Sequence, residues 1–179
     1  MSRRKRGNRT MFKLKADGFS WDQDLQIIHA DVVLEVDGET IIDEPLCVDV
    51  GLPALLLSAL EDTKPNRWAD PGEWSRMPFL VCGCGDPECR AYSFRVEHEG
   101  AGRIRLTELE ESPDGTSREL ASYEVDQAAY QEAVRRLAED YLAFTEGLDY
   151  KPLVKDTPAI VRELLERLSL AEAGHTAGE

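Results

Sequence analysis

The chain has 179 residues, of which 42% are hydrophobic, and 35 Asp and Glu outnumber 21 Lys and Arg to give a formal net charge of −14. This length and apolar content suit one domain with a hydrophobic core, which excludes wholesale disorder. No apolar run reaches the roughly 18 to 20 residues of a spanning helix, and the acidity argues against a protein dedicated to nucleic-acid binding.

The charge is distributed unevenly along the chain. Residues 1–15 carry seven Lys or Arg and no acid, so the remaining 164 residues carry a net charge of −21. We predict a disordered basic arm over 1–10, a single α+β domain over 11–172 and a frayed tail over 173–179. Because no apolar segment follows the basic residues, we expect no secretory signal and a cytoplasmic location.

The first half of the domain reads as a strand pair followed by a short helix. Asp37 and Gly38 tolerate the positive φ of a tight hairpin turn between two of the strands. Pro45 is predicted to interrupt the return strand. Pro53 suits the first turn of a helix, and the wholly apolar segment 54–60 predicts that this helix is buried. Alternating apolar and polar residues predict strands over 12–16, 28–36, 40–42 and 46–50.

The second half reads as a loop, a run of strands and two helices. Short connections between consecutive strands imply an antiparallel meander. Asp126 is placed to cap a helix that runs to about Glu146, and Thr157 to cap a second one. The sequence therefore predicts an α+β fold, in which an antiparallel meander sheet carries one short buried helix and two C-terminal helices. The predicted loop covers 63–78, and the predicted strands cover 79–82, 91–97, 103–109 and 120–125.

One motif points to specific chemistry. Cys82, Cys84 and Cys89 form a C-x-C-x4-C pattern at the tip of a predicted hairpin. Thiolates bind zinc in a tetrahedron, and Gly83 and Gly85 allow a short loop to wrap around the ion. Two alternatives stay open, namely reduced thiols with a purely structural role and a redox pair formed by Cys84 and Cys89.

Three cysteines leave one corner of a zinc tetrahedron to fill. We favour Cys47, which lies at the start of a predicted strand segment and could approach through the sheet. His98 follows the motif along an extended strand, so it would have to bend back. His29 faces away from the apolar side of its strand and reaches the motif only if the loop folds over that face. The predicted metal ligands are therefore Cys82, Cys84, Cys89 and Cys47.

The segment 82–90, which reads CGCGDPECR, resembles the post-SET zinc segment of SET-domain lysine methyltransferases. In that family three such cysteines bind zinc with a fourth cysteine from a distant part of the domain, which implies the same ligand set here, with Cys47 as the fourth. The chain has neither an Asn-His-x-Cys segment nor a recognisable methyl-donor site, so methyltransferase activity is not implied. The chain also resembles small uncharacterised bacterial proteins with a C-x-C-G-x-x-x-C hairpin, a resemblance that implies no activity.

These features favour a non-enzymatic, acidic interaction protein with a basic protein partner and a cysteine hairpin as a structural staple. One alternative is a zinc module that contacts nucleic acid through the basic arm. Another is a metal-assisted hydrolase or thiol-redox protein, in which Asp86 or Glu88 would act as a base toward a metal-bound water. The chain shows no Gly-rich phosphate loop, nucleophile elbow or H-E-x-x-H helix, so we assign no catalytic residue. We expect no membrane association, and the sequence defines no oligomeric state.

Overall fold

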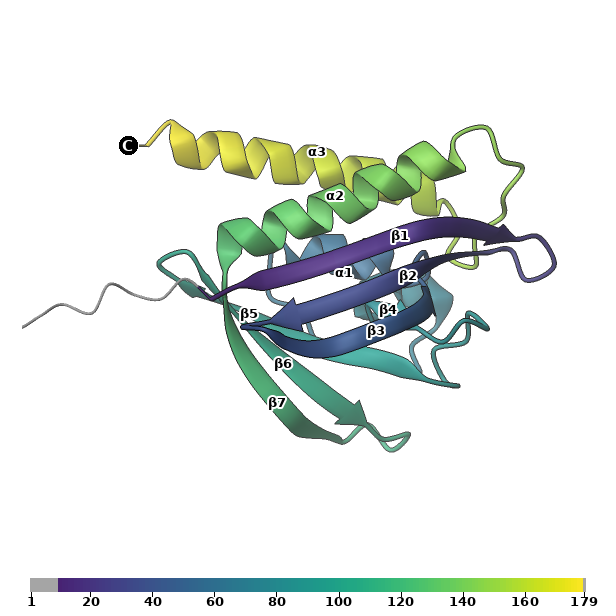
Figure 1. The fold of residues 1–179 in the computed structure, drawn as a ribbon, viewed down its shortest axis with the longest axis horizontal. Coiled ribbons are helices and arrows are strands. Elements are labelled where there is room, and N and C mark those ends of the chain that lie inside the picture. Colours follow the sequence, from purple (N-terminus) through teal and green to yellow (C-terminus); the bar gives the residue numbers. More distant parts are fainter. Residues whose placement is uncertain (1–9, 179) are drawn as a thin grey trace, which may run out of the picture.

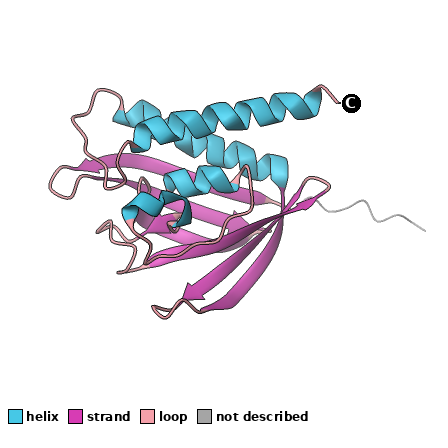
Figure 2. Cartoon of the chain, turned by 180° about the vertical axis from the view of Figure 1, so that it is seen from behind, coloured by secondary structure: helices cyan, strands magenta, loops and turns pink. Residues whose placement is uncertain are grey.

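A seven-stranded antiparallel sheet, curved along its length, carries the helices on one of its sides (Figure 1; Figure 2). This computed structural model describes residues 10–178. The strands lie in chain order from β1 to β7, which confirms the predicted α+β meander. The basic arm predicted over 1–10, with the nucleic-acid contact assigned to it, lies outside the described residues except for Thr10. Among the described residues, none of the helices has the length and hydropathy needed to cross a bilayer.

The first three strands form a meander of their own: β1 (Phe12–Asp22), β2 (Ile27–Val36) and β3 (Glu39–Cys47). Asp37 and Gly38 adopt φ values of 51° and 83°, which confirms the predicted tight turn between β2 and β3.

The predicted interruption at Pro45 is wrong, because β3 continues through this residue. Val48 N–H donates to the carbonyl of Ile28 at 2.9 Å, so the neighbouring pair of Cys47 and His29 exchanges no backbone hydrogen bonds. Pro45 lies two residues before Cys47, opposite Asp31, and this pair likewise exchanges no backbone hydrogen bonds. The nitrogen of Pro45 therefore faces away from β2. On that side β3 pairs with β4 only at Cys47, so the missing N–H breaks no ladder bond.

The middle of the chain holds the short buried helix and the segment that carries the cysteines. Helix α1 (Leu52–Ser58) is buried on all sides, as predicted. The predicted loop that follows contains a 3₁₀ helix, η1 (Pro71–Arg76). Strand β4 (Leu80–Val81) has only two residues and pairs with β5 (Ala91–Gly100), so the residues between them, 82–90, form a long hairpin loop that we call the cysteine loop.

The remaining elements complete the sheet and cover it. They are β6 (Arg103–Glu111), β7 (Ser117–Asp126), α2 (Gln127–Thr145) and α3 (Thr157–Thr176).

The caps of the two long helices match the prediction in one case only. Asp126 caps α2 as predicted, since its carboxylate accepts from Ala129 N–H at 2.9 Å. The cap predicted at Thr157 is wrong by one residue: Asp156 is the N-cap, and the Thr157 hydroxyl donates instead to the carbonyl of Val154 at 2.5 Å. Helix α3 is continuous to Thr176 and therefore includes the start of the segment for which we predicted fraying.

The core lies between the helices and one face of the sheet. Ile28, Ala30 and Val32 alternate along β2 with less buried residues and point into this core, where α1 and α2 meet the sheet. Ile27 and His29 point to the opposite face of β2. Ile27 is nevertheless only 3% exposed, so something other than the helices covers this end of the outer face. That cover is the cysteine loop.

Candidate metal centre

The three loop thiols, those of Cys82, Cys84 and Cys89, lie together with their sulfur atoms within 4.8 Å of one another. The Sγ atoms of Cys82 and Cys89 are 3.8 Å apart. A tetrahedral zinc ion with Zn–S bonds of about 2.3 Å separates its sulfur ligands by about 3.8 Å. The Cys82–Cys89 pair therefore already has the spacing of two corners of a zinc tetrahedron, and the sulfur of Cys84 lies in the same cluster. Cys82 is half-buried, whereas the other two are exposed.

Backbone hydrogen bonds inside the cysteine loop hold this spacing. Cys82 N–H donates to the carbonyl of Arg90 at 2.7 Å and closes the hairpin at the base of the loop. Gly85 N–H donates to the Cys82 carbonyl at 2.8 Å, and Cys89 N–H donates to the Asp86 carbonyl at 3.2 Å. These two consecutive turns place a cysteine at the start of the first turn and another at the end of the second.

The two acids that we considered as catalytic bases belong to the second of these turns. The Asp86 carboxylate accepts from the backbone N–H of Glu88 at 2.9 Å, which is an Asx turn. Glu88 in turn offers its backbone carbonyl to the side chain of Arg67. Asp86 thus has a structural part in shaping the loop.

Two glycines let the loop pack closely on the outer face of β2. Gly85 has a φ of +78°, and a Cβ at this position would lie only 2.8 Å from Cγ2 of Ile27. At Gly83 a Cβ would lie 3.6 Å from Nε2 of His29, so the imidazole ring is directly against the loop backbone. The loop does fold over this face, which was the condition for His29 to reach the motif.

Two arginines fasten the loop from its sides. Arg67, in the segment before η1, donates through Nε to the carbonyl of Pro87 at 2.9 Å and through a terminal nitrogen to that of Glu88 at 3.1 Å. Arg90 forms a two-pronged ion pair with Glu44 on β3, at 2.6 and 2.5 Å. The hydrogen bonds from Arg90 and from the hydroxyl of Tyr92 lower the pKa of Glu44 to about 2.

The thiols influence one another's protonation. The backbone N–H and the thiol of Cys84 donate hydrogen bonds that lower the pKa of Cys82. The pKa of Cys89 is raised to about 11, because hydrogen bonds from its thiol, first to Cys82 and second to Cys84, stabilise the protonated form. The two shifts therefore favour loss of a proton at Cys82 over loss of a proton at Cys89.

The structure places Cys47 outside the group of three thiols. Its side chain is fully buried, and its thiol donates to Oδ1 of Asp49 at 2.9 Å. Burial first, and then the nearby Asp49 carboxylate, raise the pKa of the Cys47 thiol. Asp49 is itself buried, and the hydroxyl of Tyr150 donates to its second oxygen.

His98 lies away from the loop. Its Nε2 donates to the carbonyl of Ser58, at the end of α1, at 2.9 Å. The Nε2 of His29, by contrast, contacts the carbonyl of Gly83 within the cysteine loop itself. Sequence reasoning missed this contact and the part played by Arg67, since both depend on which surface the loop covers. Two glycines at alternate positions of the loop were the available signal.

No protein-family model matches the chain, and no curated protein or solved structure matches it significantly.

Proposed function

We propose that this protein is a non-enzymatic, acidic interaction protein whose cysteine loop binds a structural metal ion. The observation that carries the metal site is the 3.8 Å separation of the Cys82 and Cys89 sulfur atoms, with Cys84 in the same cluster. Thiolate ligands select soft or borderline ions, and zinc is the redox-inert member of that group. The ion would join both ends of the loop and so add to the hydrogen bonds, the two arginines and the packing on β2 that hold it.

The proposal of a structural role follows from the surroundings of the thiols. Asp86 within the loop accepts from the Glu88 N–H and so shapes the turn, and Glu44 on β3 is engaged by Arg90 and Tyr92, which supports a structural rather than a catalytic role for these two carboxylates. A structural zinc site stabilises a fold by binding only the folded state. Free thiols also suit a reducing compartment, so a cytoplasmic location is part of the proposal.

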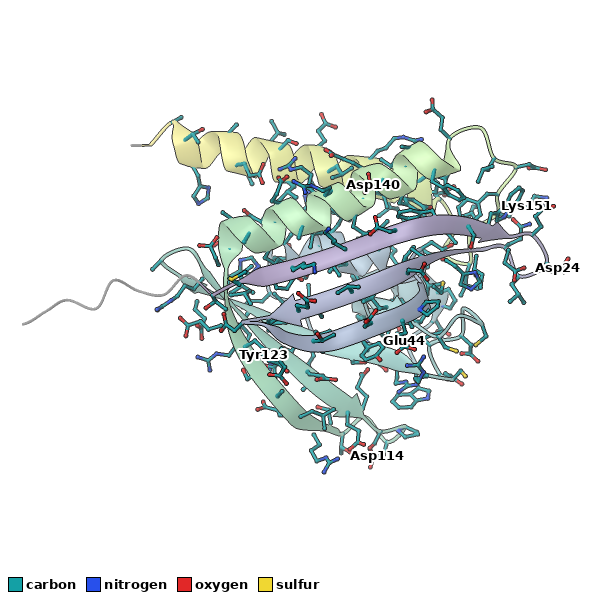
Figure 3. The ribbon with its side chains drawn as sticks, viewed as in Figure 1. Asp24, Glu44, Asp114, Tyr123, Asp140 and Lys151 are labelled. Atoms are coloured by element: carbon teal, nitrogen blue, oxygen red, sulfur yellow. The ribbon has the colours of Figure 1, made fainter. Side chains whose placement is uncertain are left out.

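The proposed partner is a basic protein. Residues 10–178 contain 34 acidic and 16 basic side chains, a net charge of −18. The acids are distributed over several elements: Asp24 lies in the β1–β2 turn, Asp114 in the β6–β7 turn and Asp140 on α2 (Figure 3). A surface of this charge attracts a positively charged partner and accelerates association.

Metal analysis of protein purified without a polyhistidine tag tests the metal site. We expect one equivalent of zinc, shielded loop thiols, and loss of the metal in Cys84→Ser protein that keeps its circular dichroism spectrum. Metal-free protein that cannot be reloaded with zinc under reducing conditions would refute the site. A Cys82–Cys89 or Cys84–Cys89 disulfide that forms and is reduced reversibly in place of metal binding would favour the thiol-redox alternative.

Partner binding requires a separate experiment. Proteins that co-purify with the chain from its native host are identified, purified and titrated against it at low and physiological ionic strength. We expect a stoichiometric complex with a basic protein, whose association rate falls steeply as salt is added. Binding that is indifferent to salt would contradict the electrostatic part of the proposal.

A further inference from the structure

We infer that His29 is the fourth ligand of the metal ion and that the centre is therefore of the Cys3His type. This inference depends on the proposed metal site in the cysteine loop, and it deepens that proposal by assigning the last corner of the tetrahedron. Structural zinc sites are almost always closed by four protein ligands, so three thiolates imply one more donor nearby.

The geometry places the ring of His29 against the loop. Its Nε2 contacts the carbonyl of Gly83, the residue between Cys82 and Cys84. Gly85 packs on Ile27, two residues before His29 on the same face of β2, so the loop is aligned with this strand at two successive outward positions. The Nε2 atom lies outside the group of sulfur atoms that are within 4.8 Å of one another, so coordination requires the Gly83–Cys84 peptide to rotate and the thiols to move toward the ring.

Cys47 is the competing candidate, and it is close in the sheet, since it is paired with His29 across the β2–β3 ladder. Its sulfur, however, is directed to Asp49, at 2.9 Å from the carboxylate oxygen. Coordination through Cys47 would leave a thiolate and a carboxylate side by side in a fully buried place, which is costly. His29 has no such neighbour among its described hydrogen-bond partners.

The charge of the resulting centre also fits its surroundings. Three thiolates, one neutral imidazole and Zn²⁺ sum to a single negative charge, whereas four thiolates would leave two. The guanidinium of Arg67 lies against the loop carbonyls of Pro87 and Glu88, and no ion pair engages it among the described residues. One unpaired cation beside the loop therefore balances a Cys3His centre.

Cobalt substitution tests the inference, because the visible ligand-field bands of Co²⁺ report both the tetrahedral geometry and the number of thiolate and nitrogen ligands. His98→Asn is the matched control for His29→Asn, since each histidine places Nε2 against a backbone carbonyl, but only that of His29 belongs to the cysteine loop. Cys47→Ala tests the competing ligand.

We expect His29→Asn to shift the cobalt bands and weaken Co²⁺ and Zn²⁺ binding by at least about 10-fold, and His98→Asn and Cys47→Ala to leave both unchanged. His29→Cys should restore tight binding, with stronger thiolate-to-cobalt absorption, which separates ligation from a purely structural role. Bands and affinities of His29→Asn that match those of His98→Asn would overturn the inference, as would their loss in Cys47→Ala. Absence of binding in the unmodified protein would instead refute the metal site itself.

Discussion

Gly85 provides a quantitative test of how closely the cysteine loop packs on the sheet. Its φ is +78°, and an added Cβ would approach Cγ2 of Ile27 to 2.8 Å. A left-handed conformation costs an alanine about 1 kcal/mol, and one extra carbon forced into a packed contact costs about 1 to 3 kcal/mol. We therefore expect Gly85→Ala to lower the free energy of unfolding by about 2 to 4 kcal/mol and the Tm by roughly 5 to 15 °C.

Gly115→Ala is the matched control. Gly115 has a similar φ of +86°, but a Cβ there would meet nothing within 4 Å, so only the backbone cost of about 1 kcal/mol applies. Urea titration and thermal melting, followed by circular dichroism on metal-free protein, measure both variants. If Gly85→Ala is destabilised no more than Gly115→Ala, the loop is not packed on Ile27 and the reasoning about its alignment with β2 fails.

Three further predictions concern thiol access, pH and helix capping. In metal-free folded protein a thiol reagent should modify the three loop thiols at once and Cys47 only after denaturation, because Cys47 is fully buried; four fast thiols would contradict this. The folded-state pKa of Glu44 is lowered from 4.5 to about 2, so its ion pair with Arg90 stabilises the fold above pH 4.5 and is lost as the pH falls toward 2. Urea titrations at successive pH values should therefore show that Glu44→Gln protein loses less stability on acidification than the unmodified protein. An equal loss of stability in the two proteins would contradict this prediction. Asp126→Ala should lower the free energy of unfolding by about 1 kcal/mol, measured by urea titration, whereas Asp156→Gly should not lower it, because Asp156 makes no side-chain cap bond and has a φ of 61°.

The order and type of the elements follow from patterns that the sequence displays directly. Alternation along β2 and the tight turn at Asp37 and Gly38 define the hairpin without any knowledge of the rest of the chain. The wrong prediction at Pro45 has a different origin: its effect depends on which side of β3 its nitrogen faces and on whether a strand lies there. Both are properties of the ladder register, and local sequence does not contain them.

The cap of α3 shows a similar limit on a smaller scale. Thr157 and Asp156 are both suitable cap residues, and the preference for Asp over Thr at this position is small. The choice follows from the backbone, because Asp156 adopts a positive φ and the hydroxyl of Thr157 turns back to the carbonyl of Val154.

The predicted ligand set separates in the same way into a local part and a non-local part. Cys82, Cys84 and Cys89 lie close in sequence, and the spacing alone brings them together, as the structure bears out for these three. A fourth ligand comes from elsewhere in the chain, so its prediction requires knowing which surface the loop covers. Cys47 and His29 are neighbours across the β2–β3 ladder, and sequence reasoning could rank them only by ligand chemistry.

A signal for that surface was nevertheless present in the pattern of β2. Residues on its outer face are mostly charged or half-exposed, and Asp31 and Glu35 belong to this set. Ile27 breaks the pattern, since a large apolar residue at an outward position requires a cover that the helices on the other face cannot supply. Gly83 and Gly85, two residues apart, match the spacing of outward positions on a strand. A large apolar residue at the end of a mostly polar strand face, together with a loop that has glycines at this spacing, therefore predicts where the loop folds and which histidine it meets.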